Sequence, residues 1–370
     1  MKKVIAAGHI CLDITPVIPH SRTYSRVGEL LEPGKLLNVE QADVHTGGSV
    51  ANTGLALKKL GVDVTLMGKA GADAFGALLS RLLEQHGAGG LLADAESSTS
   101  YSVVLAIPGI DRIFLHNPGA NDTFSNRDIP DAALTDAALF HFGYPPLMKK
   151  MYQDGGAELT AIFRRMKEKG IATSLDFAAV DPNSEAGRAD WGAIIDSVLP
   201  WVDFFVPSFE ELCFMLDRGR YERLAAKGGD MTRGLDMASE AKPLADSLME
   251  RGGRAVLIKC GTAGMYYRTA SRAEMERAGS RLGLDAELWA NQEGVQPSFK
   301  ADIVRSATGA GDASIAAFLA AVLRGKPPRE CAALAAAEGA CSVTAYDALS
   351  GLKPLEELEA RINAGWEAMR

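Results

Sequence analysis

Six short apolar runs recur along this chain, with helical segments between them. The runs cover residues 4–8, 64–68, 138–143, 172–177, 204–207 and 255–260. Apolar runs of this length are typical of strands that are buried on both faces of a parallel sheet. Segments 50–60, 159–169 and 240–251 carry apolar residues at helical spacing. The repeated order of strand and then helix predicts an α/β domain, which we expect to span residues 1–370.

The alternation of strand and helix patterns is interrupted in two regions, residues 15–45 and 98–116. In the second region, segments 101–107 and 112–116 have the pattern of a hairpin around Pro108-Gly109. We expect a small β layer formed by parts of 13–45 and 98–118. A minor sheet beside a parallel sheet can cover a site, so a lid is one interpretation. An additional edge hairpin without this function is the other.

The composition favours a small-molecule ligand over a polyanionic partner. The 370 residues include 47 Asp and Glu against 39 Lys and Arg, which gives a net charge of −8. Because no basic field attracts polyanions, we expect neither nucleic acid nor a membrane as a partner. The five cysteines are scattered without a Cys-x-x-Cys pair, and no apolar run reaches membrane-spanning length. These features predict a globular protein of the cytoplasm with reduced thiols.

A glycine-flanked turn, Gly309-Ala310-Gly311, precedes Asp312 and an apolar helix that we expect to run to about Leu323. Glycines allow a tight turn whose N–H groups point outward, and the helix dipole adds to their affinity for an anion. A carboxylate beside such a site is suited to take a proton from a hydroxyl that attacks phosphate. The alternative is an ordinary helix cap, because Asp is also a common capping residue.

A second glycine turn, Gly47-Gly48, opens the segment that contains Asn52. Without side chains the turn allows a sugar-sized ligand to approach, and the amide of Asn52 can bind its hydroxyls. Asp13 follows the first apolar run, where ligands of open α/β sheets are held, and a carboxylate there can accept two vicinal hydroxyls. A plain turn and a loop residue remain the alternative interpretations.

Two further segments lie at the carboxyl ends of apolar runs. Lys259, Gly261 and Gly264 could flank a nucleotide, or they could form a hairpin turn. Glu210 and Glu211 are candidates to hold magnesium through water, because this ion prefers oxygen ligands and keeps much of its hydration. Such a pair of acids also commonly begins a solvated helix.

Spacing excludes several other kinds of site. Segment 28–36 resembles the common phosphate loop, but its glycines are one residue too far apart and Leu36 replaces the hydroxyl that binds magnesium. Gly309-x-Gly311-x-x-Ser314 lacks the following strand-helix-strand unit of a dinucleotide site. The six histidines show no zinc spacing, and no serine has the pattern of a hydrolase nucleophile.

Taken together, the site elements resemble the ribokinase-like, or PfkB-type, carbohydrate kinase family over roughly residues 3–350. The elements, in the family's order, are Asp13, Gly47-Gly48 with Asn52, Gly71-x-Asp73-x-x-Gly76, Glu211, Gly261-x-x-Gly264 and Gly309-Ala310-Gly311-Asp312. The resemblance implies a Rossmann-like three-layer α/β/α sandwich with a small β-sheet lid. It also implies ATP-dependent phosphorylation of a hydroxymethyl group on a sugar or nucleoside, with magnesium as cofactor.

The resemblance also assigns roles to individual residues. Asp312 resembles the catalytic base, and Gly309 to Gly311 resemble the anion hole. The acceptor-site positions are Asp13, Gly47, Gly48 and Asn52; the nucleotide-site positions are Lys259, Gly261, Gly264 and Ser208; and Glu211 is the acidic position near magnesium and phosphate.

The chain departs from the family's pattern at four places, one of which is a pair of residues. Ser306 stands where the family usually has an aspartate, and Asp347-Ala348 replaces a common Gly-Ala pair near the monovalent-cation loop, which puts potassium activation in doubt. Ser208 replaces the usual asparagine, and Ala178 follows Asp176-Phe177 where an asparagine is common. Contacts to the nucleotide and to magnesium are therefore expected to differ in detail.

The leading hypothesis is an ATP-dependent kinase of a small sugar. A nucleoside kinase would need an aromatic platform for the base, for which Phe114, Phe142 and Tyr144 are candidates, although each could equally belong to the core. A non-catalytic sugar or nucleotide sensor is a hypothesis of another class. The sequence does not name the sugar, and a homodimer through an exposed lid edge is expected by analogy alone.

Overall fold

The described residues of the computed structural model, 2–19, 23–110 and 112–369, contain an eight-stranded sheet. Its strand order is β14-β13-β12-β11-β10-β9-β1-β4, and all six predicted strands lie side by side in it with parallel pairing. β13 and β14 continue the sheet with antiparallel pairing. The bounds are β1 (Lys3–Gly8), β4 (Asp63–Met67), β9 (Ala137–Gly143), β10 (Ala172–Asp176), β11 (Phe204–Phe205), β12 (Ala255–Lys259), β13 (Met265–Thr269) and β14 (Glu293–Gln296).

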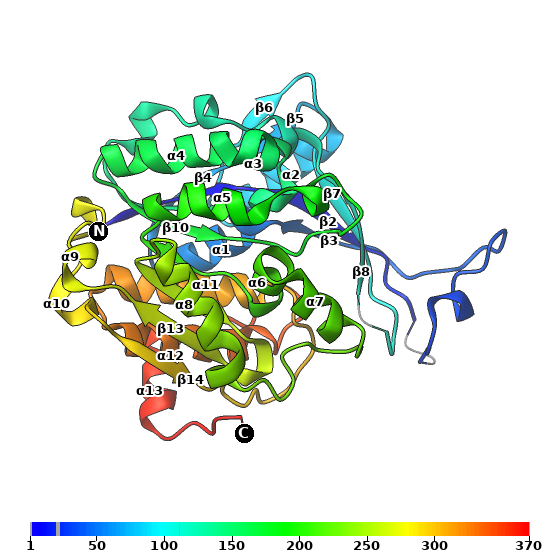
Figure 1. Ribbon diagram of the computed structural model, residues 1–370. Helices are drawn as coiled ribbons and strands as arrows, with labels where there is room; N and C mark the ends of the chain where they lie inside the picture. The colour runs from blue at the N-terminus through cyan, green and yellow to red at the C-terminus, as the bar shows by residue number, and fades with distance from the viewer. Residues whose placement is uncertain (1, 20–22, 111, 370) are drawn as a thin grey trace.

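Helices cover both faces of this sheet, because alternate residues of its buried strands point to opposite sides. Ile5 and Ile258 pack in a core cluster with α3 (Lys149–Tyr152), α4 (Ala157–Glu168), α5 (Trp191–Val198), α6 (Phe209–Leu216) and α8 (Lys242–Glu250). Val4 and Leu257 pack in a second cluster with α1 (Ser49–Lys59), α11 (Ala310–Leu323), α12 (Pro328–Ser342) and α13 (Leu355–Asn363). Figure 1 shows the resulting three layers, which confirm the predicted α/β/α sandwich.

The remaining helices lie outside these two layers or at their ends. They are α2 (Ala74–Gln85), α7 (Arg218–Ala225), α9 (Arg272–Met275) and α10 (Ala286–Trp289). Asp73 caps α2 by accepting from the Gly76 backbone N–H at 2.8 Å. The short strand β5 (Lys69–Gly71) precedes this helix, β6 (Leu92–Asp94) follows it, and the two strands pair in parallel. In the described ranges, every helix is too short or too polar to cross a membrane.

Helix α11, which follows the Gly-Ala-Gly turn, is buried over nearly its whole surface. Every residue from Asp312 to Val322 is buried, because the helix packs against both α1 and α12 under the sheet. A helix that is apolar all round is typical of such a central position. Its N-terminal half is therefore fixed by packing against α1 and α12.

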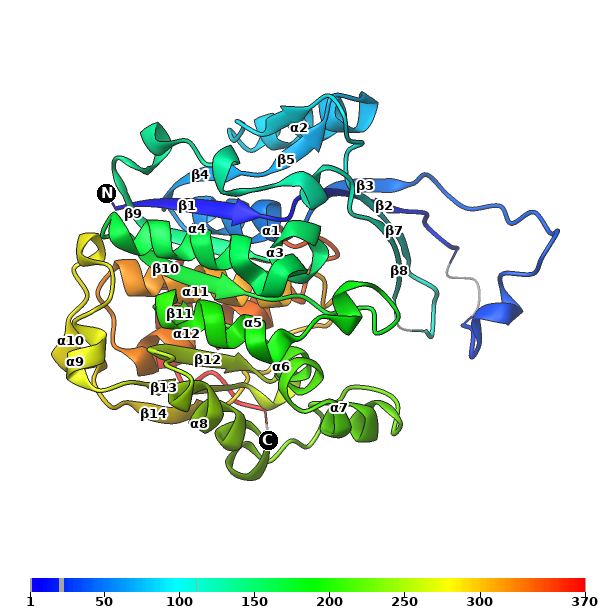
Figure 2. The same ribbon diagram turned by 45° about the horizontal axis from the view of Figure 1, so that its top comes forward.

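A second sheet extends from one end of the first, with the order β3-β2-β7-β8. Its strands are β2 (Cys11–Thr15), β3 (Asp43–Gly47), β7 (Tyr101–Leu105) and β8 (Ile113–Asn117). β7 and β8 form the predicted antiparallel hairpin, and the segment between β2 and β3 reaches away from the body of the molecule in Figure 2. Residues 20–22 and 111 of the predicted lid segments lie outside the described residues. Phe114 and Leu115 expose more than half of their surface on β8, and the homodimer through this sheet stays a prediction.

Candidate active site

The carboxylate of Asp312 lies where the N-termini of α1 and α11 meet. It accepts hydrogen bonds from Asn52 Nδ2 at 3.1 Å, Thr53 Oγ1 at 3.0 Å and the Tyr144 hydroxyl at 2.7 Å. Only 3% of Asp312 is exposed. A carboxylate offers about four acceptor positions, so three donors leave room for about one more. The Asn52 contact joins segments that are 260 residues apart and brings the early glycine turn to the proposed base.

Tyr144 is the partner of Asp312 that the sequence did not identify as such. It directly follows β9 and has left-handed backbone angles (φ 66°), a conformation that a bulky residue rarely adopts outside a constrained site. Burial and the neighbouring Asp312 charge raise the pKa of Tyr144 well above its usual value, so the phenol remains a proton donor. Its position at the carboxyl end of a parallel strand was the available signal.

The turn before α11 presents unpaired backbone donors. Gly309 adopts left-handed angles (φ 72°), and the helix begins at Ala310. The backbone N–H groups of Gly311 and Asp312 have no hydrogen-bond acceptor within the described part of the chain. Such N–H groups at a helix N-terminus are suited to bind an anion. The Arg112 side chain, from the loop between β7 and β8, donates to the Thr308 hydroxyl beside this turn.

Replacing Gly309 by alanine is expected to destabilise the fold and to lower activity, whereas Gly311→Ala should keep the fold. A Cβ on Gly309 would lie 2.3 Å from Ala348 Cβ. The left-handed backbone conformation would cost an alanine roughly 1–2 kcal/mol in addition. A Cβ on Gly311 would be in ordinary contact with the Lys259 side chain, 3.7 Å from Nζ and 4.0 Å from Cε. Thermal denaturation of both variants tests this. Equal melting temperatures would contradict the role given to Gly309.

A buried ion pair lies beside the glycine turn. Lys259 Nζ, at the end of β12, is 2.7 Å from Asp176 Oδ1, at the end of β10. Burial alone would lower the pKa of Lys259, but the charges of Asp176, Glu211 and Asp312 outweigh it and raise this pKa. Lys259 therefore remains a cation next to Gly311, surrounded by three carboxylates.

Ser208 and Glu211 begin α6 with a reciprocal cap. The Glu211 carboxylate accepts from the Ser208 backbone N–H at 2.7 Å, and the Glu211 N–H donates to Ser208 Oγ at 3.3 Å. The helix-start interpretation is thus confirmed, while the effect of Glu211 on the pKa of Lys259 indicates that it also faces the site. Burial raises the pKa of the adjacent Glu210 to about 7. Within residues 2–19, 23–110 and 112–369, no three His, Cys, Asp or Glu side chains are grouped as metal ligands.

Gly261 and Gly264 lie in the turn between β12 and β13, so the hairpin interpretation is confirmed. Gly264 has a positive φ of 109°, and a Cβ there would approach the Gln296 carbonyl oxygen within 2.2 Å. A Cβ on Gly261 would meet the Thr232 hydroxyl at 2.4 Å. Packing against the protein itself thus accounts for both glycines, and their contact with a nucleotide stays a prediction.

Asp13 and the early glycines lie together at the start of the second sheet. A Cβ on Gly47 would lie 2.3 Å from Asp13 Oδ2, and one on Gly48 would lie 2.6 Å from His9 Nδ1. Burial raises the pKa of Asp13, and Asp312 is among the charges that raise it further. His9 and His116 contact each other at 3.3 Å between their Nε2 atoms. The structure thus brings Asp13, Gly47 and Gly48 close to the proposed base.

The loop after α12 closes the other side of the Gly309 turn. Asp347 accepts from the backbone N–H groups of Leu349 at 2.8 Å and Ser350 at 2.7 Å, which holds Ala348 against Gly309. Glu338, fully buried in α12, accepts from the Lys353 N–H at 3.1 Å and anchors the end of this loop. Activation by a monovalent cation at this loop stays an open prediction.

Glu338→Gln is expected to make the protein relatively more stable than the wild type as the pH rises. Burial raises the pKa of Glu338 to about 8, so its neutral form supports the fold at low pH and this support is lost as the pH approaches 8. Glutamine keeps the acceptor for Lys353 but does not titrate. The unfolding free energy of Glu338→Gln minus that of the wild type should therefore rise by about 1.4 kcal/mol per pH unit between roughly pH 5 and 8.

Urea unfolding at several pH values measures this difference. Glu84→Gln, an exposed position on α2, serves as the control and should show no comparable slope. A flat difference for Glu338→Gln would show that the carboxyl titrates alike in the folded and unfolded chain.

The fold is that of ribokinases, a class of kinases built on this sandwich. The chain superimposes on *Arabidopsis thaliana* ribokinase complexed with ribose and ATP with a TM-score of 0.71 and 18% identity, over 97% of this chain and 98% of that one. A putative ribokinase II from *E. coli* in complex with ATP and Mg²⁺ gives a TM-score of 0.68 and 21% identity, over 98% and 100% of the two chains.

The family model of the pfkB carbohydrate kinases matches residues 1–354, and the chain belongs to this family. An ATP-dependent ribose-1-phosphate kinase of *Halopiger xanaduensis* is 27% identical over 360 residues, which cover 95% of this chain and 97% of the relative. Fructokinase-2 of *Zea mays* is 27% identical over 285 residues, 75% of this chain and 71% of the relative. The protein is thus a carbohydrate kinase, and the resemblance drawn from its motifs is confirmed.

Proposed function

We propose that this protein transfers the γ-phosphoryl group of ATP to a primary hydroxyl of a small sugar or sugar derivative, with Asp312 as the base. One observation carries the proposal. The Asp312 carboxylate has room for about one more donor, and it adjoins two backbone N–H groups without acceptors in the described residues. A hydroxyl and a phosphoryl group can therefore be bound next to each other.

In the proposed reaction the acceptor hydroxyl donates its hydrogen bond to Asp312 and then its proton. The oxygen attacks the γ-phosphorus in line with the leaving ADP, through a loose transition state whose charge lies on the phosphoryl oxygens. The N–H groups of Gly311 and Asp312 and the Lys259 ammonium are in place to stabilise that charge. Little covalent help is needed, so positioning supplies most of the catalysis.

The acceptor is held, in this proposal, by Asp13, Gly47, Gly48 and Asn52. Ser208, Lys259, Gly261 and Gly264 line the nucleotide side. Closure of the second sheet would exclude water, which otherwise competes with the sugar for the phosphoryl group. Of the three aromatic candidates for a nucleoside platform, Phe142 is fully buried in the core and Tyr144 donates to Asp312, which supports a sugar. Phe114, which is exposed on β8, stays a candidate for such a platform.

Magnesium would arrive with ATP and neutralise its phosphate oxygens. This ion keeps several waters and usually takes only one or two protein carboxylates. Glu211 and Asp176, which both influence Lys259, are suited to hold those waters.

The test is ADP release from Mg-ATP against a panel of pentoses, hexoses, sugar acids, sugar phosphates and nucleosides. We expect turnover with a member of one sugar class. Turnover with nucleosides alone would replace the proposal by a nucleoside kinase. Heat stabilisation by a sugar without any turnover would favour the non-catalytic sensor.

A further inference from the structure

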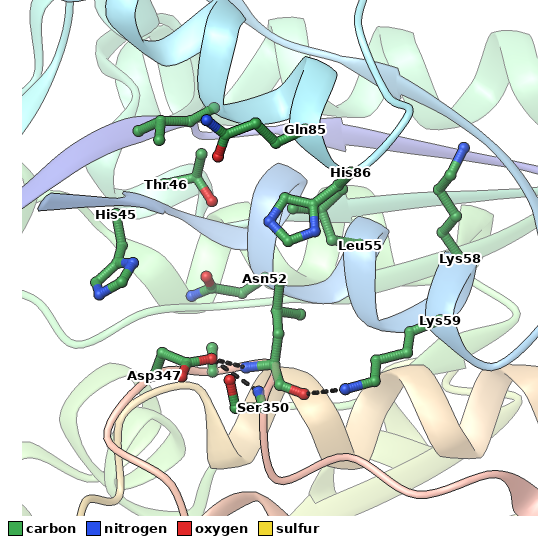
Figure 3. Close-up of a pocket in the computed structure, with 13 residues that line it drawn as sticks. His45, Thr46, Asn52, Leu55, Lys58, Lys59, Gln85, His86, Asp347 and Ser350 are labelled. Carbon is green, nitrogen blue, oxygen red and sulfur yellow. Dashed lines mark hydrogen bonds between the residues drawn. The ribbon is translucent and has the colours of Figure 1, made fainter.

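A side pocket of about 560 Å³ adjoins the proposed acceptor site. It lies between α1, the C-terminal end of α2, the end of β3 and the loop at 347–350, as Figure 3 shows. This volume lies within the usual range for small-ligand sites. The lining residues that carry the argument are Asn52, Lys58, Lys59, Gln85, His86 and Asp347.

The pocket adjoins the proposed base at Asn52. This side chain lines the pocket and also donates to Asp312 Oδ2 at 3.1 Å. In Figure 3 the imidazole rings of His45 and His86 lie on either side of the Asn52 amide. The pocket and the Asp312 carboxylate therefore lie on two sides of one side chain.

Positive charge predominates among the lining side chains. Lys58 Nζ donates to the Gly87 carbonyl at 2.6 Å and Lys59 Nζ to the Leu349 carbonyl at 2.7 Å. Neither ammonium has a carboxylate within ion-pair distance among the residues that the structure describes. A carbonyl takes up only one of the three N–H groups of each lysine, so both can bind a further acceptor.

Carboxylates lie in and beside the pocket, including the buried Glu338, whose pKa is raised by burial and lowered in part by the charge of Lys59. Asp347 is the one carboxylate in the lining, and it accepts from two backbone N–H groups of its own loop. Asp43 lies 2.6 Å from the His45 ring and is not part of the pocket lining. The side chains of Gln85 and His86 make no hydrogen bond within the described ranges, so they are available as additional donors.

We propose that the side pocket binds an anionic substituent of the acceptor, a phosphate or a carboxylate on the sugar, while the primary hydroxyl of the same molecule lies on Asp312. This inference rests on the proposed function and narrows its substrate class to anionic sugars. The chain as a whole carries a net charge of −8, so an anionic acceptor needs local cations such as Lys58 and Lys59.

The experiment compares acceptors that share one carbon skeleton and one free primary hydroxyl, as the neutral sugar, the sugar acid and the sugar phosphate. Wild type, Lys59→Met, His86→Gln and the control Lys150→Met, an exposed lysine of α3, are assayed by ADP release. We expect the anionic acceptors to have the lower KM. The two pocket variants should raise that KM about tenfold, as for the loss of a charged hydrogen bond, and leave kcat within about twofold.

Calorimetric titration of the same acceptors without ATP separates this inference from the proposed function. Binding of the acid or the phosphate that weakens in His86→Gln but not in Lys150→Met supports the pocket even if no acceptor is turned over. Which of the two anions binds more tightly identifies the substituent. Equal or better use of the neutral sugar, or anionic binding that the pocket variants leave unchanged, would overturn the inference while leaving the kinase itself intact. Circular dichroism verifies that each variant is folded.

Discussion

Replacing Asp312 by asparagine is expected to lower kcat by roughly 10² to 10⁴-fold, the usual contribution of a positioned base. Asparagine fills the same space and can still accept from Asn52, Thr53 or Tyr144, but it cannot take the proton of the acceptor hydroxyl. ATP binding should barely change, because its phosphates contact backbone N–H groups and Lys259 in the proposed site. Steady-state kinetics and calorimetric titration of ATP measure the two effects separately.

Tyr144→Phe provides the matched comparison, because it removes one donor to Asp312 and leaves the carboxylate in place. We expect a smaller loss, of at most roughly 10- to 150-fold, since one hydrogen bond to a charged group is worth about 1.5–3 kcal/mol and two donors remain. Near-normal turnover by Asp312→Asn would refute the role of Asp312 as the base.

Lys259→Met is expected to lower the free energy of unfolding by about 3–5 kcal/mol, as found when one partner of a buried ion pair is removed. Asp176 is 1% exposed, and without Lys259 its charge would be buried alone. Burial already raises the pKa of Asp176, so the carboxyl of the variant should take up a proton instead. A group with a raised folded-state pKa stabilises the fold at low pH. The deficit of the variant should therefore grow as the pH rises.

Urea denaturation between pH 5 and 8 measures this deficit. The double variant Lys259→Met/Asp176→Asn contains no unpaired charge, and we expect it to regain a large part of the lost stability at pH 8. The prediction would be wrong if both variants lost the same stability, or if the single variant lost less than about 1 kcal/mol.

Patterns that are local in the sequence predicted most of the fold. The six apolar runs became adjacent strands of one sheet, and the hairpin around residue 108 formed as expected. Helices α1, α4 and α11 begin and end within a few residues of the predicted bounds. These features depend on the spacing of apolar residues and on glycines at turns, and both can be recognised from residues that are close together in the sequence.

Which side chains from distant segments form hydrogen bonds or ion pairs was decided by the tertiary structure. The family resemblance assigned Asp312, Gly309 to Gly311 and Asn52 to one site, whereas each glycine turn by itself left an ordinary cap or turn open. The sequence did not pair Lys259 with Asp176, or Tyr144 with Asp312. Lys259 and Asp176 lie at the ends of two different strands, β12 and β10. Tyr144 follows β9, and Asp312 lies in the distant helix α11.

The chain alone therefore determined its elements, its family and the approximate location of its site, since these depend on residue type and local spacing. The order of strands and the packing of α1 against α11 decided which polar groups lie within hydrogen-bond distance of each other, which charges are buried, and where a side pocket opens beside Asn52. Distances between segments up to 290 residues apart are set by how whole elements pack, which no local pattern encodes.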